Sequence, residues 1–207
     1  MPTGIDASTN CGAAAACLKA AGHDFVARYY ANRGKKVLTA EEAGQLNAAG
    51  LKLVVVWEDG SPTSADYFSY SKGVDDSTSA FHDAMQLGQP IQSPIYFAVD
   101  FDAKQVQITG SIADYFRGIA DGFNTAAAGG PAHPIGVYGS GATCSWLLAR
   151  QAVNYAWLAQ STKWTGFDDF VAWNIKQGAE TVVCGIDVDP NIAVDDYGGF
   201  MLPPLVA

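Results

Sequence analysis

Short apolar segments alternate with longer segments of helical pattern along the whole of this 207-residue chain. The apolar segments are rich in β-branched and aromatic residues, as is typical of buried strands. They lie at residues 3–6, 25–30, 51–58, 93–102, 135–138, 155–159, 170–175 and 182–188. Helices are predicted at residues 12–21, 39–49, 74–87 and 105–128, and in a segment that follows Gly141 and ends at Gln151. This alternation predicts an α/β fold with a parallel sheet.

Eight strands with intervening helices favour a closed (β/α)8 TIM barrel. The last connections leave little room for a full helix, so we expect the barrel to be short and irregular in its last units. The competing architecture, an open doubly wound sheet, usually carries a glycine-rich phosphate loop after its first strand. This chain has Ala7-Ser8-Thr9-Asn10 there instead. No break in composition divides the sequence, so we expect a single barrel domain over residues 1–207.

The negative net charge of the chain argues against some classes of binding partner. Its formal net charge is −9, and its basic residues are scattered singly apart from Arg33, Lys35 and Lys36. This argues against binding to nucleic acid or to an anionic membrane surface. No apolar run has the length that a membrane span needs, and the first residues lack the basic and apolar regions of a signal peptide. We expect a monomer without a cofactor.

The four cysteines, Cys11, Cys17, Cys144 and Cys184, fit no zinc-binding spacing, because C-x-x-C is absent and the three histidines are isolated. Their even number permits disulfides, and Cys11 and Cys17 are the closest pair in sequence. Free buried thiols are the alternative, and the sequence favours neither.

The segment 93–102 (SPIYFAVDFD) is an apolar run that ends in two acids. Residues i and i+2 of a strand project from the same face, so we expect Asp100 and Asp102 side by side at the carboxyl end of a buried strand. Each carboxylate opposes the ionisation of the other. Paired acids in such a place indicate metal binding or acid–base chemistry.

Further polar and aromatic residues fall at the same ends of the predicted strands, where barrel enzymes hold their active sites. The acids are Asp6, Glu58, Asp100, Asp102, Asp187 and Asp189, and the other candidates are Arg28, Tyr30, Trp57, Tyr138, Gln160, Trp173 and Gln177. Asp189 precedes Pro190 and is interpreted as a turn residue, whereas Asp187 lies inside an apolar run and is interpreted as functional. Clustered carboxylates with aromatic faces between them suit the hydrolysis of a glycan. A site for Mg²⁺ or Ca²⁺ held by the acids alone is an alternative, and packing at the rim is the alternative for Tyr30, Trp57 and Tyr138.

Four short motifs, in this order, resemble a bacterial family of glycoside-hydrolase-like TIM-barrel domains that was first classed as a domain of unknown function. They are Gly4-Ile5-Asp6, residues 97–102 (FAVDFD), residues 136–139 (GVYG) and residues 186–189 (IDVD). That family is similar to the family 25 glycoside hydrolases, the lysozymes of phages, bacteria and fungi. The resemblance covers nearly the whole chain. It implies a cell-wall polysaccharide, with peptidoglycan as the first candidate, and an extracellular or cell-envelope location.

The family 25 lysozymes carry an Asp on strand one, an Asp-x-Glu on strand four and a late Asp, which correspond here to Asp6, Asp100, Asp102 and Asp187. At Asp102 the lysozymes have the glutamate that donates the proton, and this chain has the shorter acid. The resemblance implies a lysozyme-like glycosidase in which Asp102 or Glu58 is the general acid and Asp100 stabilises the developing positive charge. The cleft would be shaped by Tyr30, Trp57, Tyr138 and Trp173. The alternatives are a catalytically inert barrel that binds glycan, which the missing glutamate favours, and a metal-dependent hydrolase.

Overall fold

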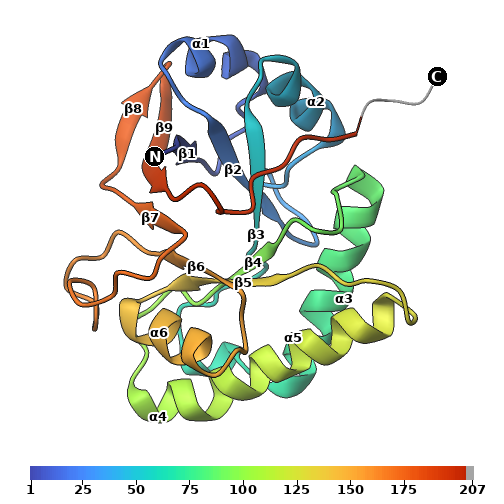
Figure 1. Cartoon of the computed structure of the whole chain (residues 1–207), viewed down its shortest axis with the longest axis vertical. Helices are drawn as coiled ribbons and strands as arrows, with labels where there is room; N and C mark the ends of the chain where they lie inside the picture. Colours follow the sequence, from blue (N-terminus) through green and yellow to red (C-terminus); the bar gives the residue numbers. More distant parts are fainter. Residues whose placement is uncertain (204–207) are drawn as a thin grey trace.

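The computed structural model describes residues 1–203, and its strands close into a barrel (Figure 1). β1 to β7 follow one another as parallel neighbours, and β9 closes the ring between β7 and β1. The strand bounds are β1 Thr3–Asp6, β2 Phe25–Tyr30, β3 Lys52–Trp57, β4 Ile95–Ala98, β5 Ile135–Gly139, β6 Tyr155–Leu158, β7 Ile175–Gln177, β8 Thr181–Val183 and β9 Ile186–Ala193. The predicted α/β barrel is confirmed.

The last strand of the barrel runs against its neighbours, which corrects the expectation of eight parallel β/α units. β9 is antiparallel to both β7 and β1. The chain enters β9 through a hairpin in which Val183 pairs with Ile186 across Cys184 and Gly185. Both turn residues have positive φ, 54° and 76°, as a two-residue type I′ turn requires. The predicted strand 182–188 is therefore two strands, because a turn this short reverses the chain and cannot contain the helix of a parallel crossover.

Helices cover the barrel on two sides (Figure 1). Their bounds are α1 Ala15–Ala20, α2 Ala40–Ala48, α3 Tyr70–Leu87, α4 Gln105–Gln107, α5 Ala113–Ala126 and α6 Gly141–Ala149, with single turns of other helix types at Gly12–Ala14, Ala65–Tyr67 and Ile108–Ile112. The predicted helices are all present. α3 begins earlier than expected because the Ser69 hydroxyl caps it, accepting from Lys72 N at 3.2 Å. Within residues 1–203 no helix lies between β6 and β9.

Side chains that alternate along the strands fill two separate layers. The inner layer contains no helical residue and consists of Phe25, Ala27, Val54, Val56, Tyr96, Ala98, Trp157, Ile175, Ala193 and Tyr197. The alternate strand residues, such as Val55 and Phe97, pack outward with residues of the helices. A residue two positions beyond an inner-layer residue continues on the inner face for as long as the chain stays extended.

A disulfide joins Cys17 of α1 to Cys184 in the turn of the β8–β9 hairpin. The partners are 167 residues apart in sequence. Cys11 and Cys144 are buried free thiols. The pairing of Cys11 with Cys17, which their spacing in sequence permits, is therefore not formed.

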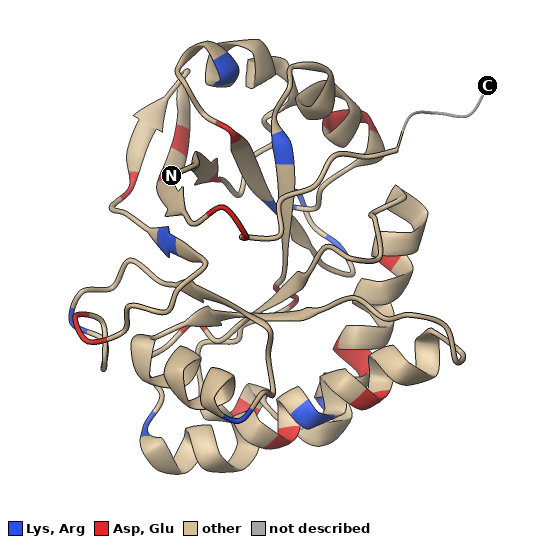
Figure 2. Cartoon of the chain, in the orientation of Figure 1, with Lys and Arg blue, Asp and Glu red and all other residues tan. Residues whose placement is uncertain are grey.

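The charged residues of the described chain are spread over the fold. In Figure 2 the lysine and arginine positions lie apart from one another on several strands, helices and loops. None of the helices in residues 1–203 combines the length and the apolar character that crossing a bilayer requires.

Candidate functional site

Four acids lie at the mouth of the barrel where the parallel strands end. Asp6 is the last residue of β1, and Glu58 and Asp100 each lie two positions beyond an inner-layer residue. Asp189 is opposite Asp6 in the β1–β9 pair, because the antiparallel β9 begins at this end of the barrel. We call these four residues the mouth cluster. Strand alternation places them on the inner face.

Asp6 is the most buried member of the mouth cluster, with 3% of its surface exposed. Its carboxylate accepts hydrogen bonds from Asn191 Nδ2 at 2.7 Å and from Gln177 Nε2 at 3.0 and 3.2 Å. Burial raises the pKa of Asp6 to about 7; the charges of Asp189 and Glu58 also raise it, and the two amide donors lower it. Asp6 is therefore able to exchange a proton near neutral pH.

The raised pKa of Asp6 predicts that stability falls with rising pH. The ordinary pKa is 3.8 and the folded value is about 7, so between these values the folded protein binds a proton that the unfolded chain has released. The free energy of unfolding then falls as the pH rises through this range and changes little above it. The side chain of Asp6→Asn stays neutral at every pH, so this variant does not lose stability in that way. The free energy of unfolding of the variant minus that of the wild type should therefore be greater at about pH 8 than at about pH 5, by about 1 kcal/mol or more. Urea unfolding at both pH values measures this, and an equal difference at the two would contradict it.

Glu58 and Asp100 form the part of the mouth cluster that faces Lys36. Lys36 Nζ lies 2.6 Å from Glu58 Oε1 and 4.9 Å from the ring centre of Tyr29. Burial raises the pKa of Asp100, the charge of Glu58 raises it further, and Lys36 opposes both effects. Burial therefore makes Asp100 an acid that is suited to hold a proton.

Two amides and a tyrosine form a hydrogen-bond network around Asp6 and Asp189. Gln177 donates from Nε2 to Asp189 Oδ2 at 3.2 Å as well as to Asp6, and its Oε1 accepts from Tyr138 Oη at 2.9 Å. Gln160 Nε2 donates to Asp189 Oδ1 at 3.3 Å. Tyr138, Gln160 and Gln177 were site candidates from the sequence, and the structure brings all three to the mouth cluster.

A cavity of about 190 Å³ lies beside Asp6. It is lined by Asp6, Ala7, Ser8, Tyr29, Glu180, Asp187, Val188 and Asp189. Burial raises the pKa of Asp189, and the charge of Glu180 adds to this effect. A space of this size is smaller than the usual pocket for a whole ligand, so it suits one polar group of a larger molecule. In residues 1–203 no group of three or more His, Cys, Asp or Glu is placed to hold a metal ion.

Comparison with known proteins identifies the family. The model of the Rv2525c-like, glycoside hydrolase-like domain matches residues 16–193. The chain belongs to this family. Among curated proteins, YbfG of Bacillus subtilis is 33% identical over 170 residues, which are 75% of this chain and 23% of YbfG. This Rv2525c-like domain therefore spans about a quarter of the length of that relative.

Solved structures share the fold of this Rv2525c-like domain. The Tat-secreted protein Rv2525c of Mycobacterium tuberculosis, solved with L-tartrate, has a TM-score of 0.78 at 23% identity, over 96% of this chain and 98% of that one. A lysozyme of Streptomyces coelicolor has a TM-score of 0.55 at 18% identity, and the match covers 93% of this chain and 91% of the lysozyme chain. The autolysin LytC of Streptococcus pneumoniae, solved with a synthetic peptidoglycan ligand, has a TM-score of 0.60 at 16% identity. The match covers 92% of this chain and 46% of the LytC chain.

Asp102 lies away from the mouth cluster of this Rv2525c-like domain. β4 ends at Ala98 and the chain bends at Phe101, between the two acids, so the alternation that directs Asp100 inward does not extend to Asp102. The exposed Asp102 carboxylate accepts from Thr165 N at 2.8 Å and from Thr165 Oγ1 at 3.1 Å. Asp102 therefore stabilises the loop between β6 and β7 through these hydrogen bonds and does not pair with Asp100.

Three other sequence candidates point outward from the strands that carry them. Arg28 is fully buried and contacts Glu42, with 2.7 Å between Nε and Oε1. Tyr30 Oη donates to Gln89 Oε1 at 2.9 Å, and Trp57 is 1% exposed in the outer layer. Their neighbours in sequence point inward. The strands therefore lie where the sequence predicts them, but these three side chains are on the outer face and not on the inner one.

The remaining candidates lie at the edge of the site or outside it. Asp187 is exposed and lines the 190 Å³ cavity, whereas Trp173 is partly buried against the outer layer. The site residues that sequence reasoning missed are Tyr29, Lys36, Glu180 and Asn191, and Asp189 was interpreted as a turn residue although it belongs to the site. For β9 a signal was present, because Asp187, Asp189 and Asn191 are spaced by two, which predicts one face of a strand.

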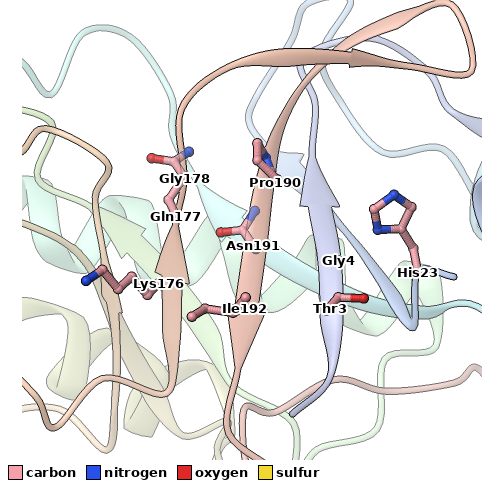
Figure 3. Close-up of a pocket in the computed structure, with 9 residues that line it drawn as sticks. All are labelled: Thr3, Gly4, His23, Lys176, Gln177, Gly178, Pro190, Asn191 and Ile192. Carbon is pink, nitrogen blue, oxygen red and sulfur yellow. The ribbon is translucent and has the colours of Figure 1, made fainter. Parts of the chain in front are cut away.

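A second cavity, of about 450 Å³, lies on the outer face of β7, β9 and β1 (Figure 3). It is lined by Thr3, Gly4, His23, Lys176, Gln177, Gly178, Pro190, Asn191 and Ile192. Pro190 and Ile192 alternate with the inward-pointing Asn191, which places the cavity outside the barrel, on the side that has no helix. Its lining includes no acid, so we assign the candidate site to the mouth cluster instead.

Proposed function

We propose that this domain hydrolyses a β-linked cell-wall glycan, with peptidoglycan as the first substrate to test. The observation that carries the proposal is the mouth cluster, in which Asp6, Asp100 and Asp189 all have a raised pKa. Glycoside hydrolysis needs a carboxylic acid that protonates the leaving oxygen and a carboxylate that acts at the sugar carbon or on water. The barrel shared with a lysozyme, and with an autolysin solved with a peptidoglycan ligand, supports this choice of substrate.

The geometry favours Asp100 as the general acid. Its burial, and the neighbouring carboxyl of Glu58, form the kind of environment that keeps a carboxyl protonated. β4 and β9 lie on opposite sides of the ring of strands, so Asp100 and the Asp6–Asp189 pair flank the mouth from opposite sides. In the proposed reaction Asp100 gives its proton to the glycosidic oxygen, and Asp6 or Asp189 provides the second carboxyl. Water supplies the hydroxyl of the new reducing end and returns a proton to the site.

A second candidate function is glycan binding without turnover. The observation that favours it concerns the two acids that the family resemblance implies as proton donors. Glu58 is paired with Lys36, and Asp102 is bonded to Thr165. If Asp100 cannot replace them, the mouth would bind a sugar through its carboxylates and amides and leave the bond intact.

We propose an extracellular or cell-envelope location for the domain. The Cys17–Cys184 disulfide supports it, because disulfides persist in oxidising compartments. The Tat-secreted Rv2525c, which has the same fold, supports it as well.

Incubation of the purified domain with insoluble peptidoglycan tests both functions. Reducing ends and soluble fragments measure hydrolysis, and sedimentation with the insoluble glycan measures binding. Release of reducing ends is the expected result. Binding without product would favour the second candidate, and the absence of both would contradict both. Chitin and β-glucan, assayed in parallel, define which glycan is preferred.

A further inference from the structure

Gln177 is held in one orientation inside the barrel. It is 5% exposed at the end of β7. Its Oε1 accepts two hydrogen bonds, from Tyr138 Oη at 2.9 Å and from Gln160 N at 3.1 Å. The backbone N–H of Gln160 can only donate, so the amide oxygen must lie on that side and the NH2 group on the other.

The NH2 group of Gln177 points at two acids at once. Nε2 lies 3.0 and 3.2 Å from the two oxygens of Asp6 and 3.2 Å from Asp189 Oδ2. Asp6 and Asp189 are direct neighbours across the β1–β9 pair. The two N–H groups of one amide therefore lie between two carboxyls that repel each other when both are charged.

We propose that Gln177 is a positioning residue that holds Asp6 and Asp189 together as one acid–base unit and joins that unit to Tyr138. The proposal rests on the proposed function, and it places Gln177 behind the acids rather than against the glycan. Two carboxyls in such a unit lose their protons in two steps that belong to the pair. One proton then stays on the unit over the pH range between the steps.

Several charged or titratable groups also face this unit. They are Glu58 beyond β3, Tyr29 of β2, Tyr138 of β5, Glu180 before β8 and Asp187 of β9. Three of these are acids, so they disfavour further negative charge on the unit. The N–H donors of Gln177 and Asn191 act in the opposite sense, because they stabilise a carboxylate.

The test is the titration of the Asp6 carboxyl, followed by ¹³C NMR in the whole domain. Gln177→Met keeps the side-chain volume and removes the donors, so the pKa of Asp6 should rise by about one pH unit or more. Tyr138→Phe frees one side of the amide oxygen and should raise that pKa by less. Gln86→Met, a matched change at an exposed position on α3, should leave it unchanged.

An Asp6 pKa that stays within about 0.3 pH unit in folded Gln177→Met would overturn the proposal. If Gln177→Met does not fold, Tyr138→Phe decides by the same measurement. The titration needs no substrate, so its outcome is separate from that of the glycan assay. Where the wild type does release product, the pH profile of Gln177→Met should move to higher pH with Asp6. Weaker glycan binding without any shift of the profile would mean that Gln177 contacts the glycan, and the proposal would be wrong.

Discussion

Replacing Asp100 with asparagine should lower glycan turnover roughly 10²–10⁴-fold while glycan binding and stability stay close to those of the wild type. Asparagine preserves the shape of the side chain but has no carboxylic proton to give to the leaving oxygen. A proton donor acts in the transition state, so the loss is expected in kcat and in kcat/KM alike. Initial rates of reducing-end release, together with sedimentation binding, measure the two effects separately.

Asp102→Asn is the matched control for this experiment, since it makes the same change two residues further along the chain. Its side chain contacts Thr165 and not the mouth cluster, so turnover should change by no more than a few-fold. The opposite pattern, with Asp102→Asn inactive and Asp100→Asn active, would return the acid role to Asp102. In the wild type, burial and Glu58 raise the pKa of Asp100. An acid must be protonated to act, so turnover should fall as the pH rises through that pKa.

Replacing Arg28 with methionine should lower the free energy of unfolding by about 3–5 kcal/mol. The Arg28 and Glu42 side chains are both 0% exposed. Arg28 also donates to the backbone oxygen of Ala7, and Glu42 accepts from Cys11 N at 2.7 Å. Removing the guanidinium leaves a carboxylate and a carbonyl buried without this partner, and that is the physical reason for the large effect. Urea unfolding monitored by circular dichroism measures it.

The double variant Arg28→Met with Glu42→Gln should recover part of that loss. Glutamine removes the buried charge and still offers an oxygen to Cys11 N. Arg117→Met is the control for an exposed pair, because Arg117 and Asp114 are 65% and 51% exposed, and it should cost less than about 1 kcal/mol. A stable Arg28→Met variant that has lost glycan binding would show instead that Arg28 acts at the site, as its position near a strand end suggested.

Most of the strands and most of the mouth acids could be predicted because both depend on local pattern. The strand predicted at residues 170–175 is an exception, since β7 is Ile175–Gln177. Apolar runs that end in Asp6, Glu58 and Asp100 are visible in the sequence, and the barrel brings such ends together. The face of a side chain is harder to predict, because it depends on where the strand stops. The i, i+2 rule succeeds for Asp100 and fails for Asp102, since the chain bends at Phe101 between them.

The direction of the last strand could not be predicted from its composition. Val182 to Val188 is apolar enough for a buried strand, and only the positive φ of Cys184 and Gly185 reveals a reversal inside it. Non-glycine residues seldom adopt that conformation, so a cysteine at this position does not predict a turn. The reversal also explains why Asp189, which was interpreted as a turn residue, lies beside Asp6. The disulfide was equally hidden, since its partners meet only when the barrel closes.

The Cys17–Cys184 bond makes the chain between these residues a covalent ring, and this ring contains every strand from β2 to β8. A single cut by a protease anywhere inside the ring leaves both products joined by the sulfur atoms. The exposed loop between β6 and β7 lies within it, so cleavage there opens the chain without releasing a fragment. After one such cut the domain therefore stays one covalent molecule until a reductant breaks the bond.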